Sequence, residues 1–201
     1  MGERKGGGSG GTGTPIEWRV LEEGGAALTA PMLHELFEHW QGLHRGRALP
    51  ARADLDPTAI KPMLPYLYMV DVSYQPLRFR YRLVGTAMVE FTGRDVTGRF
   101  VDEETYGAAL APIRRLFEIV VETRGPVGGR GRTVWIQGGE WREVESLVLP
   151  MSSDGTVIDI LLAGYVTIGR SRTLPGQAGA RHHDRIEIIP APRFEADEPG
   201  D

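Results

Sequence analysis

The sequence predicts an α+β fold: a five-stranded antiparallel sheet of order 2-1-5-4-3, helices covering one face, and an N-terminal helix. Two observations lead to this prediction. Strand-like segments fall into two groups with helical segments between the groups, which is typical of α+β proteins. The apolar pattern of each strand then indicates whether it is central or lies at an edge.

The chain divides into one domain and two polar ends. Its 201 residues favour a single domain. We expect a disordered Gly-rich tail over 1–14, a poorly defined lead-in over 15–30, the domain over 31–168 and a polar C-terminal tail over 169–201. No apolar run approaches the roughly 20 residues that span a bilayer, and no secretory signal is present. The sequence therefore predicts a cytoplasmic protein that does not bind membranes.

The amino-acid composition argues against several classes of function. The formal net charge of -4 gives no electrostatic reason to expect a nucleic-acid partner. The chain has no cysteine, which excludes disulfides, thiolate catalysis and iron–sulfur clusters. It also excludes any covalent bond between a cysteine and a cofactor.

Two helical segments precede the first strand. Residues 31–44 carry apolar side chains at spacings of three and four, which places them on one face. These side chains are Leu33, Leu36, Phe37, Trp40 and Leu43. The resulting stripe can pack on the sheet or on a second copy of the chain. Asp56 and Pro57 begin a short second helix, which must end near Pro62.

The first two strands differ in their two faces. Tyr66 to Val72 is apolar on both faces, so we expect a central strand. Along Arg78 to Val84 apolar and cationic side chains alternate: Phe79, Tyr81 and Leu83 against Arg78, Arg80 and Arg82. A row of like charges needs water around it, which places this strand at an edge. We interpret the arginine row first as a guard against edge-to-edge aggregation and second as a docking face for an acidic protein partner.

The second half of the chain supplies a long helix and three strands. Residues 85–91 begin a short helix, and Asp102 begins a long helix that ends at Gly125-Pro126. The strands that follow are Arg132 to Gln137, Trp141 to Leu149 and Thr156 to Ile168. The last of them is apolar on both faces and is expected to be central, whereas the third strand of the chain is expected at an edge. Glu143 and Glu145 are interpreted as a solvated strand face.

The same segments resemble the PAS domain family. The resembling residues are LPARADLDPTAIKPMLPYLYMVDV (49–72), RFRYRLVGTAMVEFTGRDVTG (78–98) and GYVTI (164–168). More specifically, the chain is similar to the short, single-domain PAS proteins of bacteria. The resemblance implies a cavity between the sheet and the helices that follow the second strand. It also implies a non-catalytic sensory or ligand-binding module that acts in signal transduction through a partner protein, with a homodimer as a further expectation.

Candidate cavity residues follow from the resemblance and the buried faces. They are Tyr81, Thr86, Met88, Phe91, Phe117 and Trp135. Plain core packing is the alternative for each of them. Two other functions stay open: a ligand-free interaction adaptor of the same fold, and a small α+β enzyme for which no catalytic residue can be named.

The cofactor is left unknown. The flavin photosensors of this fold bond flavin to a cysteine, which a chain without cysteine cannot do. No histidine lies between residues 72 and 168, which argues against histidine-ligated haem. His34, His39 and His44 are spaced by five, a rotation of about 140° per step, so they cannot converge on a metal and are expected at the surface or the core edge. We predict no metal site.

Overall fold

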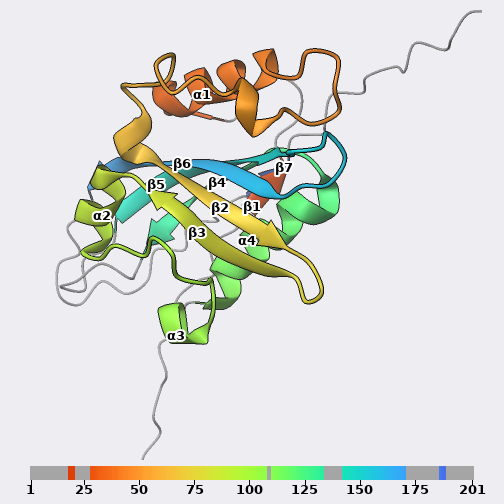
Figure 1. The fold of residues 1–201 in the computed structure, drawn as a ribbon. Helices are drawn as coiled ribbons and strands as arrows, with labels where there is room; N and C mark the ends of the chain where they lie inside the picture. Colours follow the sequence, from red (N-terminus) through yellow and green to blue (C-terminus); the bar gives the residue numbers. More distant parts are fainter. Residues whose placement is uncertain (1–17, 21–27, 108–109, 134–141, 171–185, 189–201) are drawn as a thin grey trace, which may run out of the picture.

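The computed structural model describes residues 18–20, 28–107, 110–133, 142–170 and 186–188. These residues form a seven-stranded sheet with helices on both faces (Figure 1). The strands are β1 (Trp18–Val20), β2 (Leu67–Ser73), β3 (Arg78–Val84), β4 (Val127–Thr133), β5 (Arg142–Met151), β6 (Ile160–Arg170) and β7 (Ile186–Ile188). The helices are α1 (Pro31–Gly42), α2 (Thr86–Thr92), α3 (Glu103–Tyr106) and α4 (Leu110–Thr123). Short 3-10 turns lie at Arg52–Asp54 and Leu64–Tyr66.

The strand order confirms the predicted sheet. Strands β3, β2, β6, β5 and β4 are neighbours in that order and all pair antiparallel, which is the order 2-1-5-4-3. The sheet continues past β4, where an edge was expected, because β7 and β1 both pair with β4. The edge prediction for that strand is therefore wrong. Its partners come from the segments expected to be the lead-in and the C-terminal tail, whereas the predicted Gly-rich tail lies outside the described residues.

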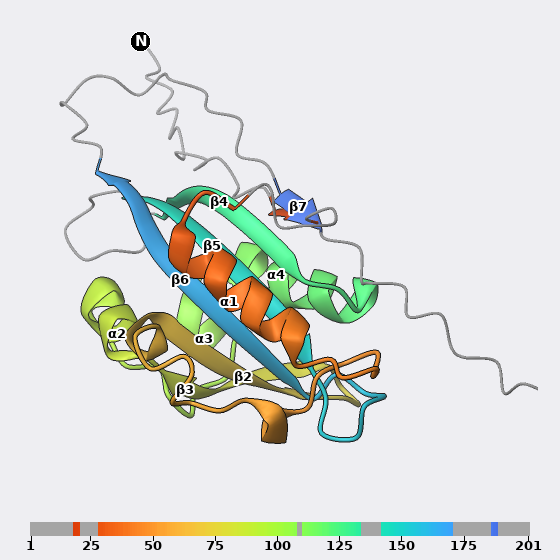
Figure 2. The same ribbon diagram turned by 90° about the horizontal axis from the view of Figure 1, so that it is seen from above.

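Helix α1, alone among the described helices, covers one face of the sheet, together with residues of the segment that follows it. Figure 2 shows it lying over β5 and β6. Its stripe of Leu33, Leu36, Phe37 and Trp40 is no more than 1% exposed, and the Trp40 indole Nε1–H donates to the Pro150 carbonyl at 3.0 Å. Of the two expected uses of the stripe, packing on the chain's own sheet is the one observed.

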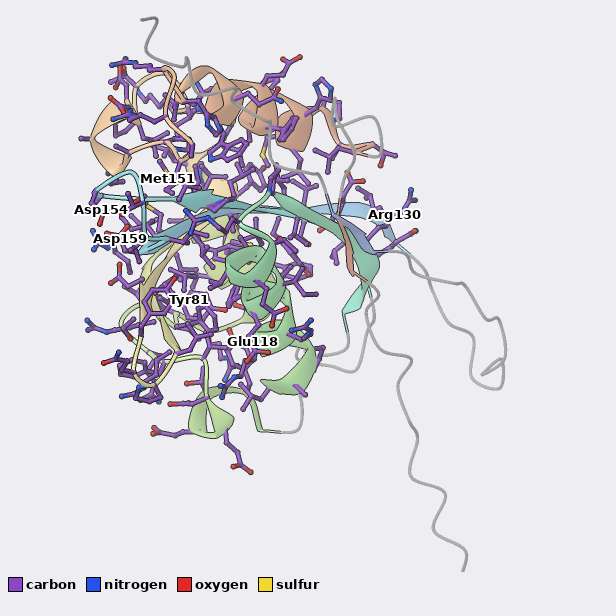
Figure 3. The ribbon with its side chains drawn as sticks, turned by 90° about the vertical axis from the view of Figure 1, so that its right-hand side faces the viewer. Tyr81, Glu118, Arg130, Met151, Asp154 and Asp159 are labelled. Atoms are coloured by element: carbon purple, nitrogen blue, oxygen red, sulfur yellow. The ribbon has the colours of Figure 1, made fainter. Side chains whose placement is uncertain are left out.

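The opposite face is covered by α2, α3 and α4 (Figure 1). Figure 3 shows Tyr81 and Glu118 on this side of the sheet, away from α1. An aromatic cluster fills its centre: the Phe117 ring lies 5.4 Å from that of Phe79 and 6.4 Å from those of Tyr68 and Tyr81. The two apolar layers are thus separated by the sheet, and the central strands β2, β5 and β6 contribute alternate side chains to both.

The long helix expected after Asp102 is interrupted. The Asp102 carboxylate caps its start as predicted and accepts the Thr105 amide at 3.0 Å. Gly107 then takes a φ of +50°, a conformation that favours glycine, so α3 ends after four residues. A new helix, α4, begins at Leu110. The predicted single helix is therefore wrong at this point, because the helical spacing of its apolar residues continues across Gly107, where the backbone leaves the helix.

A β-bulge changes the alternation of β3. Tyr81 pairs with Val70, but Leu83, two residues later, pairs with Met69, the adjacent residue of β2. The extra residue rotates the end of the strand. Leu83 is consequently 46% exposed, contrary to the prediction that it is buried beside Tyr81. Val84 takes the inward place instead.

Glu145 is buried rather than solvated. Its side chain is on β5, and the residue is 2% exposed. The carboxylate accepts the backbone N–H of Ala30 at 2.6 Å and that of Thr29 at 2.9 Å, next to the first turn of α1. The expected solvated face holds only for Glu143, which pairs with Arg130 at 3.0 Å. The error arose because residues 28–30 fold back onto β5, which no local pattern reveals.

The three histidines of the first helical region differ in burial, because His34 and His39 are partly exposed whereas His44 is buried. His44 is 3% exposed and meets the Trp40 ring edge-on at 4.5 Å between centroids. Burial is the main cause that lowers its pKa. Among the described residues no group of three or more His, Cys, Asp or Glu side chains is placed to hold a metal ion. In the same part of the chain, no helix has the length and apolar character needed to cross a membrane.

Candidate functional site

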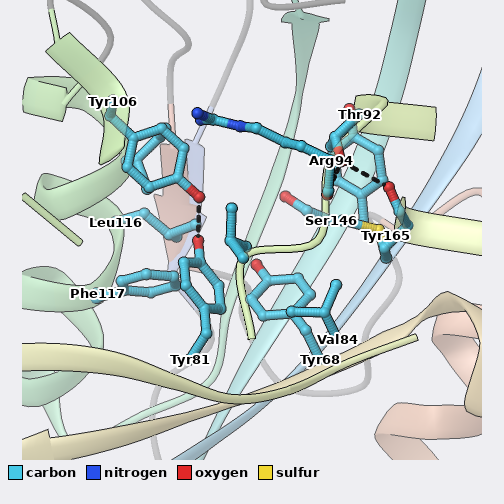
Figure 4. A pocket seen from close by; sticks show the side chains of 13 residues that line it. Tyr68, Tyr81, Val84, Thr92, Arg94, Tyr106, Leu116, Phe117, Ser146 and Tyr165 are labelled. Atoms are coloured by element: carbon cyan, nitrogen blue, oxygen red, sulfur yellow. Dashed lines mark hydrogen bonds between the residues drawn. The ribbon is translucent and has the colours of Figure 1, made fainter. Parts of the chain in front are cut away.

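A cavity of about 80 Å³ lies between the sheet and the helices α2, α3 and α4 (Figure 4). Side chains from β2, β3, β5 and β6 line it on the sheet side. The helices and the loop between α2 and α3 close the other side. The bulge in β3 directs the Val84 side chain into the cavity from the sheet side, and α2 contributes Met88 and Thr92 to its lining. The site therefore depends on the helical excursion between the second and third strands of the predicted sheet.

Four tyrosines line the cavity, namely Tyr68, Tyr81, Tyr106 and Tyr165. The hydroxyls of Tyr81 and Tyr106 are hydrogen-bonded to each other at 2.7 Å (Figure 4). Burial raises the pKa of Tyr68, Tyr81 and Tyr106 above the usual range, and the neighbouring tyrosines raise the pKa of Tyr81 further. The hydroxyls of Tyr68, Tyr81 and Tyr106 therefore stay protonated near neutral pH and can act as hydrogen-bond donors.

Arg94 brings a positive charge to the same space. It follows the end of α2, and Figure 4 shows its side chain reaching across toward Tyr106. The guanidinium lies 5.1 Å from the centre of the Tyr106 ring, within cation–π range. It is the only charged side chain among the described residues that line the cavity. The nearby charge also acts to lower the pKa of Tyr81 and Tyr106, but burial outweighs it.

The lining does not resemble a hydrolytic site. Ser146 lines the cavity from β5, and its hydroxyl donates to the Gly129 carbonyl at 3.4 Å. Among the described lining residues there is no histidine or carboxylate that could act as its base. The arrangement can bind and orient a molecule through donors and apolar walls.

The size of the cavity limits what fits. Sites for cofactors and drug-sized ligands have volumes of roughly 300–1,000 Å³, so 80 Å³ does not accommodate a flavin or a haem in this conformation. A water-sized group needs roughly 10–15 Å³. The cavity thus has room for about five to eight non-hydrogen atoms on that scale.

The structure brings three of the six candidate residues to the cavity: Tyr81, Met88 and Phe117. Phe91 instead lines a second, more open pocket of about 280 Å³ between α2 and β6, with its ring 5.0 Å from that of Tyr165. Thr86 is exposed at the start of α2. Trp135 lies outside the described residues. Whether any of these side chains contacts a ligand remains a prediction.

The three arginines of β3 are exposed on the edge strand. Each already contacts a neighbour within the chain. The Arg78 guanidinium lies 3.8 Å from the centre of the Phe100 ring, Arg80 Nε donates to the Gly98 carbonyl at 3.0 Å, and Arg82 Nε donates to Asp71 at 2.5 Å. These contacts are compatible with both interpretations of the row, the edge guard and the docking face.

Several lining residues were not among the sequence candidates. Tyr68 and Tyr106 stood in apolar faces and were treated as core, although a tyrosine in such a face needs a place for its hydroxyl. This requirement could have identified Tyr68 and Tyr106 as candidate cavity residues from the sequence. Arg94 gave no signal, because it stands in a polar loop whose path depends on the packing of α2 and α3.

Comparison with known proteins identifies the family. A family model described as PAS domain matches residues 28–165, and a search of curated proteins found no match. The structure is similar to a LOV protein of Rhodobacter sphaeroides at 16% identity and a TM-score of 0.42, over 58% of this chain and 70% of that one. It is also similar to an RNA-binding light-oxygen-voltage receptor at 18% identity and a TM-score of 0.41, over 60% of this chain and 36% of that one. The family model covers more than half of the sequence, and the chain therefore belongs to the PAS domain family.

Proposed function

We propose that this chain is a non-catalytic sensory module that binds a small ligand in the cavity and passes the signal to a partner protein. The observation that supports this most is the cavity itself, into which hydroxyl donors and one guanidinium converge from the sheet and the helices. Apolar walls with a few convergent polar groups are the usual character of small-molecule sites. A cytoplasmic location and a homodimer belong to the same proposal. The stripe of α1 is buried within the monomer, so a homodimer would use another surface.

Filling the cavity is expected to remove ligand binding without unfolding the protein. Leu116 lines the cavity from α4, and Leu116→Phe adds a ring that can enter the open space. Native mass spectrometry of the purified protein should show a mass above that of the denatured chain. The Leu116→Phe variant should lose the additional mass while its midpoint of thermal unfolding stays within a few degrees of that of the wild type.

The same substitution elsewhere provides the control. Leu162 is 1% exposed in the core beneath α1, so Leu162→Phe should overpack that layer and lower the free energy of unfolding by about 1–3 kcal/mol. Equal destabilisation by the two variants would mean that the space beside Leu116 is not available. Identical native and denatured masses of the wild type would contradict ligand retention.

A ligand-free adaptor is the second candidate function. The small volume of the cavity favours it, because a few water molecules or a slight movement of side chains would fill 80 Å³. In that case the module acts through its surface alone. A single mass in native and denatured spectra, together with capture of a protein partner, would support this candidate over the sensor.

The arginine row is the surface that we propose for the partner. Replacing Arg78, Arg80 and Arg82 by glutamine should abolish capture of an acidic partner and leave the fold intact, because exposed polar and ionic contacts contribute at most about 1 kcal/mol each. Pull-down with immobilised protein, compared with circular dichroism of the variant, measures both effects. A second triple variant, in which Arg99, Arg114 and Arg115 become glutamine, removes the same charge elsewhere. Unchanged capture by the first variant would leave the edge guard as the role of the row.

A further inference from the structure

We infer that the ligand of the cavity is a short monocarboxylic acid whose carboxylate is bound by Arg94. This inference deepens the proposed function and rests on it. It adds a chemical class and names the residue that selects that class. Three features of the site support it: an uncompensated positive charge, a surplus of hydroxyl donors, and apolar walls around a small volume.

The positive charge of Arg94 is not neutralised within the described part of the chain. Its guanidinium rests on the face of the Tyr106 ring, and no described carboxylate forms an ion pair with it. A guanidinium has five N–H donors in a planar fork that matches a carboxylate in bidentate geometry. The ring contact leaves the edge of that fork available. An anion at the cavity therefore meets a charged donor, whereas an amine would meet a like charge.

The tyrosine hydroxyls add donors near the same position. Tyr68 is 7% exposed, its hydroxyl points into the cavity (Figure 4), and no described residue forms a hydrogen bond with it. Tyr81 and Tyr106 use one of their two hydroxyl protons in their mutual bond, so the other proton remains for a further acceptor. A carboxylate is an acceptor-only group and matches this set.

The apolar lining residues and the volume of the cavity indicate the hydrocarbon part of the ligand and its length. Val84, Met88 and Leu116 present hydrocarbon to the cavity, which favours an apolar chain. Room for about five to eight non-hydrogen atoms corresponds to a monocarboxylic acid of about three to six carbons. Inorganic phosphate would satisfy the donors but leave these walls without contact.

Calorimetric titration of the full chain with pentanoate tests the inference. The probes for comparison are 1-pentanol, which lacks the charge, butylammonium, which reverses it, and inorganic phosphate, which lacks the chain. Pentanoate should bind at least tenfold more tightly than each of them. Arg94→Gln should weaken pentanoate binding by about tenfold to a hundredfold, the range expected for a lost charge-assisted contact, and leave binding of 1-pentanol unchanged.

A matched variant controls for net charge. Arg99 stands in the same loop but pairs with Glu104 at 3.2 Å and does not line the cavity, so Arg99→Gln should leave the affinity for pentanoate within about twofold. Both arginines are exposed, and thermal unfolding of both variants should match that of the wild type.

The outcomes separate the inference from the proposed function. Equal affinity for pentanoate and 1-pentanol, or no effect of Arg94→Gln, overturns the carboxylate class and leaves a cavity that binds small molecules. If no probe binds but native mass spectrometry shows a retained molecule, the class is again wrong and the proposed function stands. If no probe binds and no molecule is retained, both are overturned.

Discussion

Replacing Glu145 by alanine is expected to lower the free energy of unfolding by about 3–5 kcal/mol, because it leaves two backbone donors without their charged acceptor. These donors are the N–H groups of Thr29 and Ala30, immediately before α1. The carboxylate also places a negative charge near the positive end of the α1 dipole. Urea denaturation followed by circular dichroism measures the loss.

Two further variants separate the charge from the position. Glu145→Gln keeps an acceptor oxygen but loses the charge, so its cost should fall between that of the alanine variant and zero, at about 1–3 kcal/mol. Glu143→Ala removes a carboxylate on the same strand that pairs with Arg130 at the surface, and its cost should stay below about 1 kcal/mol. Similar costs for Glu143→Ala and Glu145→Ala would show that the contact with residues 29–30 does not stabilise the domain.

Replacing Gly85 by alanine is expected to have an effect of similar size, at least about 3 kcal/mol. A Cβ at this position would lie 2.3 Å from the carbonyl oxygen of Pro65 and 2.5 Å from that of Leu64. Both atoms belong to backbone, so the clash can be relieved only if α2 or the preceding turn moves. Thermal unfolding should show the loss. Any folded fraction should also bind its ligand more weakly, because α2 carries Met88 into the cavity.

Gly42→Ala is the matched control for that change. Gly42 is the last residue of α1, and nothing lies within 4 Å of the position that its Cβ would take. Alanine has the higher helix propensity, so the variant should be unchanged or more stable by up to about 1 kcal/mol. If Gly85→Ala is tolerated as well as Gly42→Ala, the close approach of α2 to residues 64–65 is not a constraint on the fold.

The sheet could be predicted because its signals are local. The two apolar faces of β2 identify it as a central strand, and the alternating arginines of β3 identify it as an edge strand. The helices between the strands then leave few possible strand orders. The strands β1 and β7 were not predicted, because each is three residues long and pairs with a strand that is distant in the sequence. The burial of Glu145 was not predicted for a similar reason, because it depends on residues more than a hundred positions away in the sequence.

The site was less predictable than the fold. Tyr81 and Phe117 could be proposed from buried faces that point to the helical cover. Arg94 and Val84 could not, because their directions depend on a loop path and on the bulge in β3. Periodicity predicts which side of a strand a residue occupies only while the register is regular.

The bulge in β3 also determines how this cavity can change in size. If β3 kept all its residues but had no bulge, Arg82 would pair with Met69 and Leu83 with Tyr68, and Leu83 would face the cavity in the place of Val84. The longer side chain would take up part of the 80 Å³, and Gly85 with the start of α2 would shift along β2 by one position. Loss or movement of this bulge would therefore change the cavity in whole-residue steps, a route to new ligand sizes that is separate from the exchange of one side chain for another.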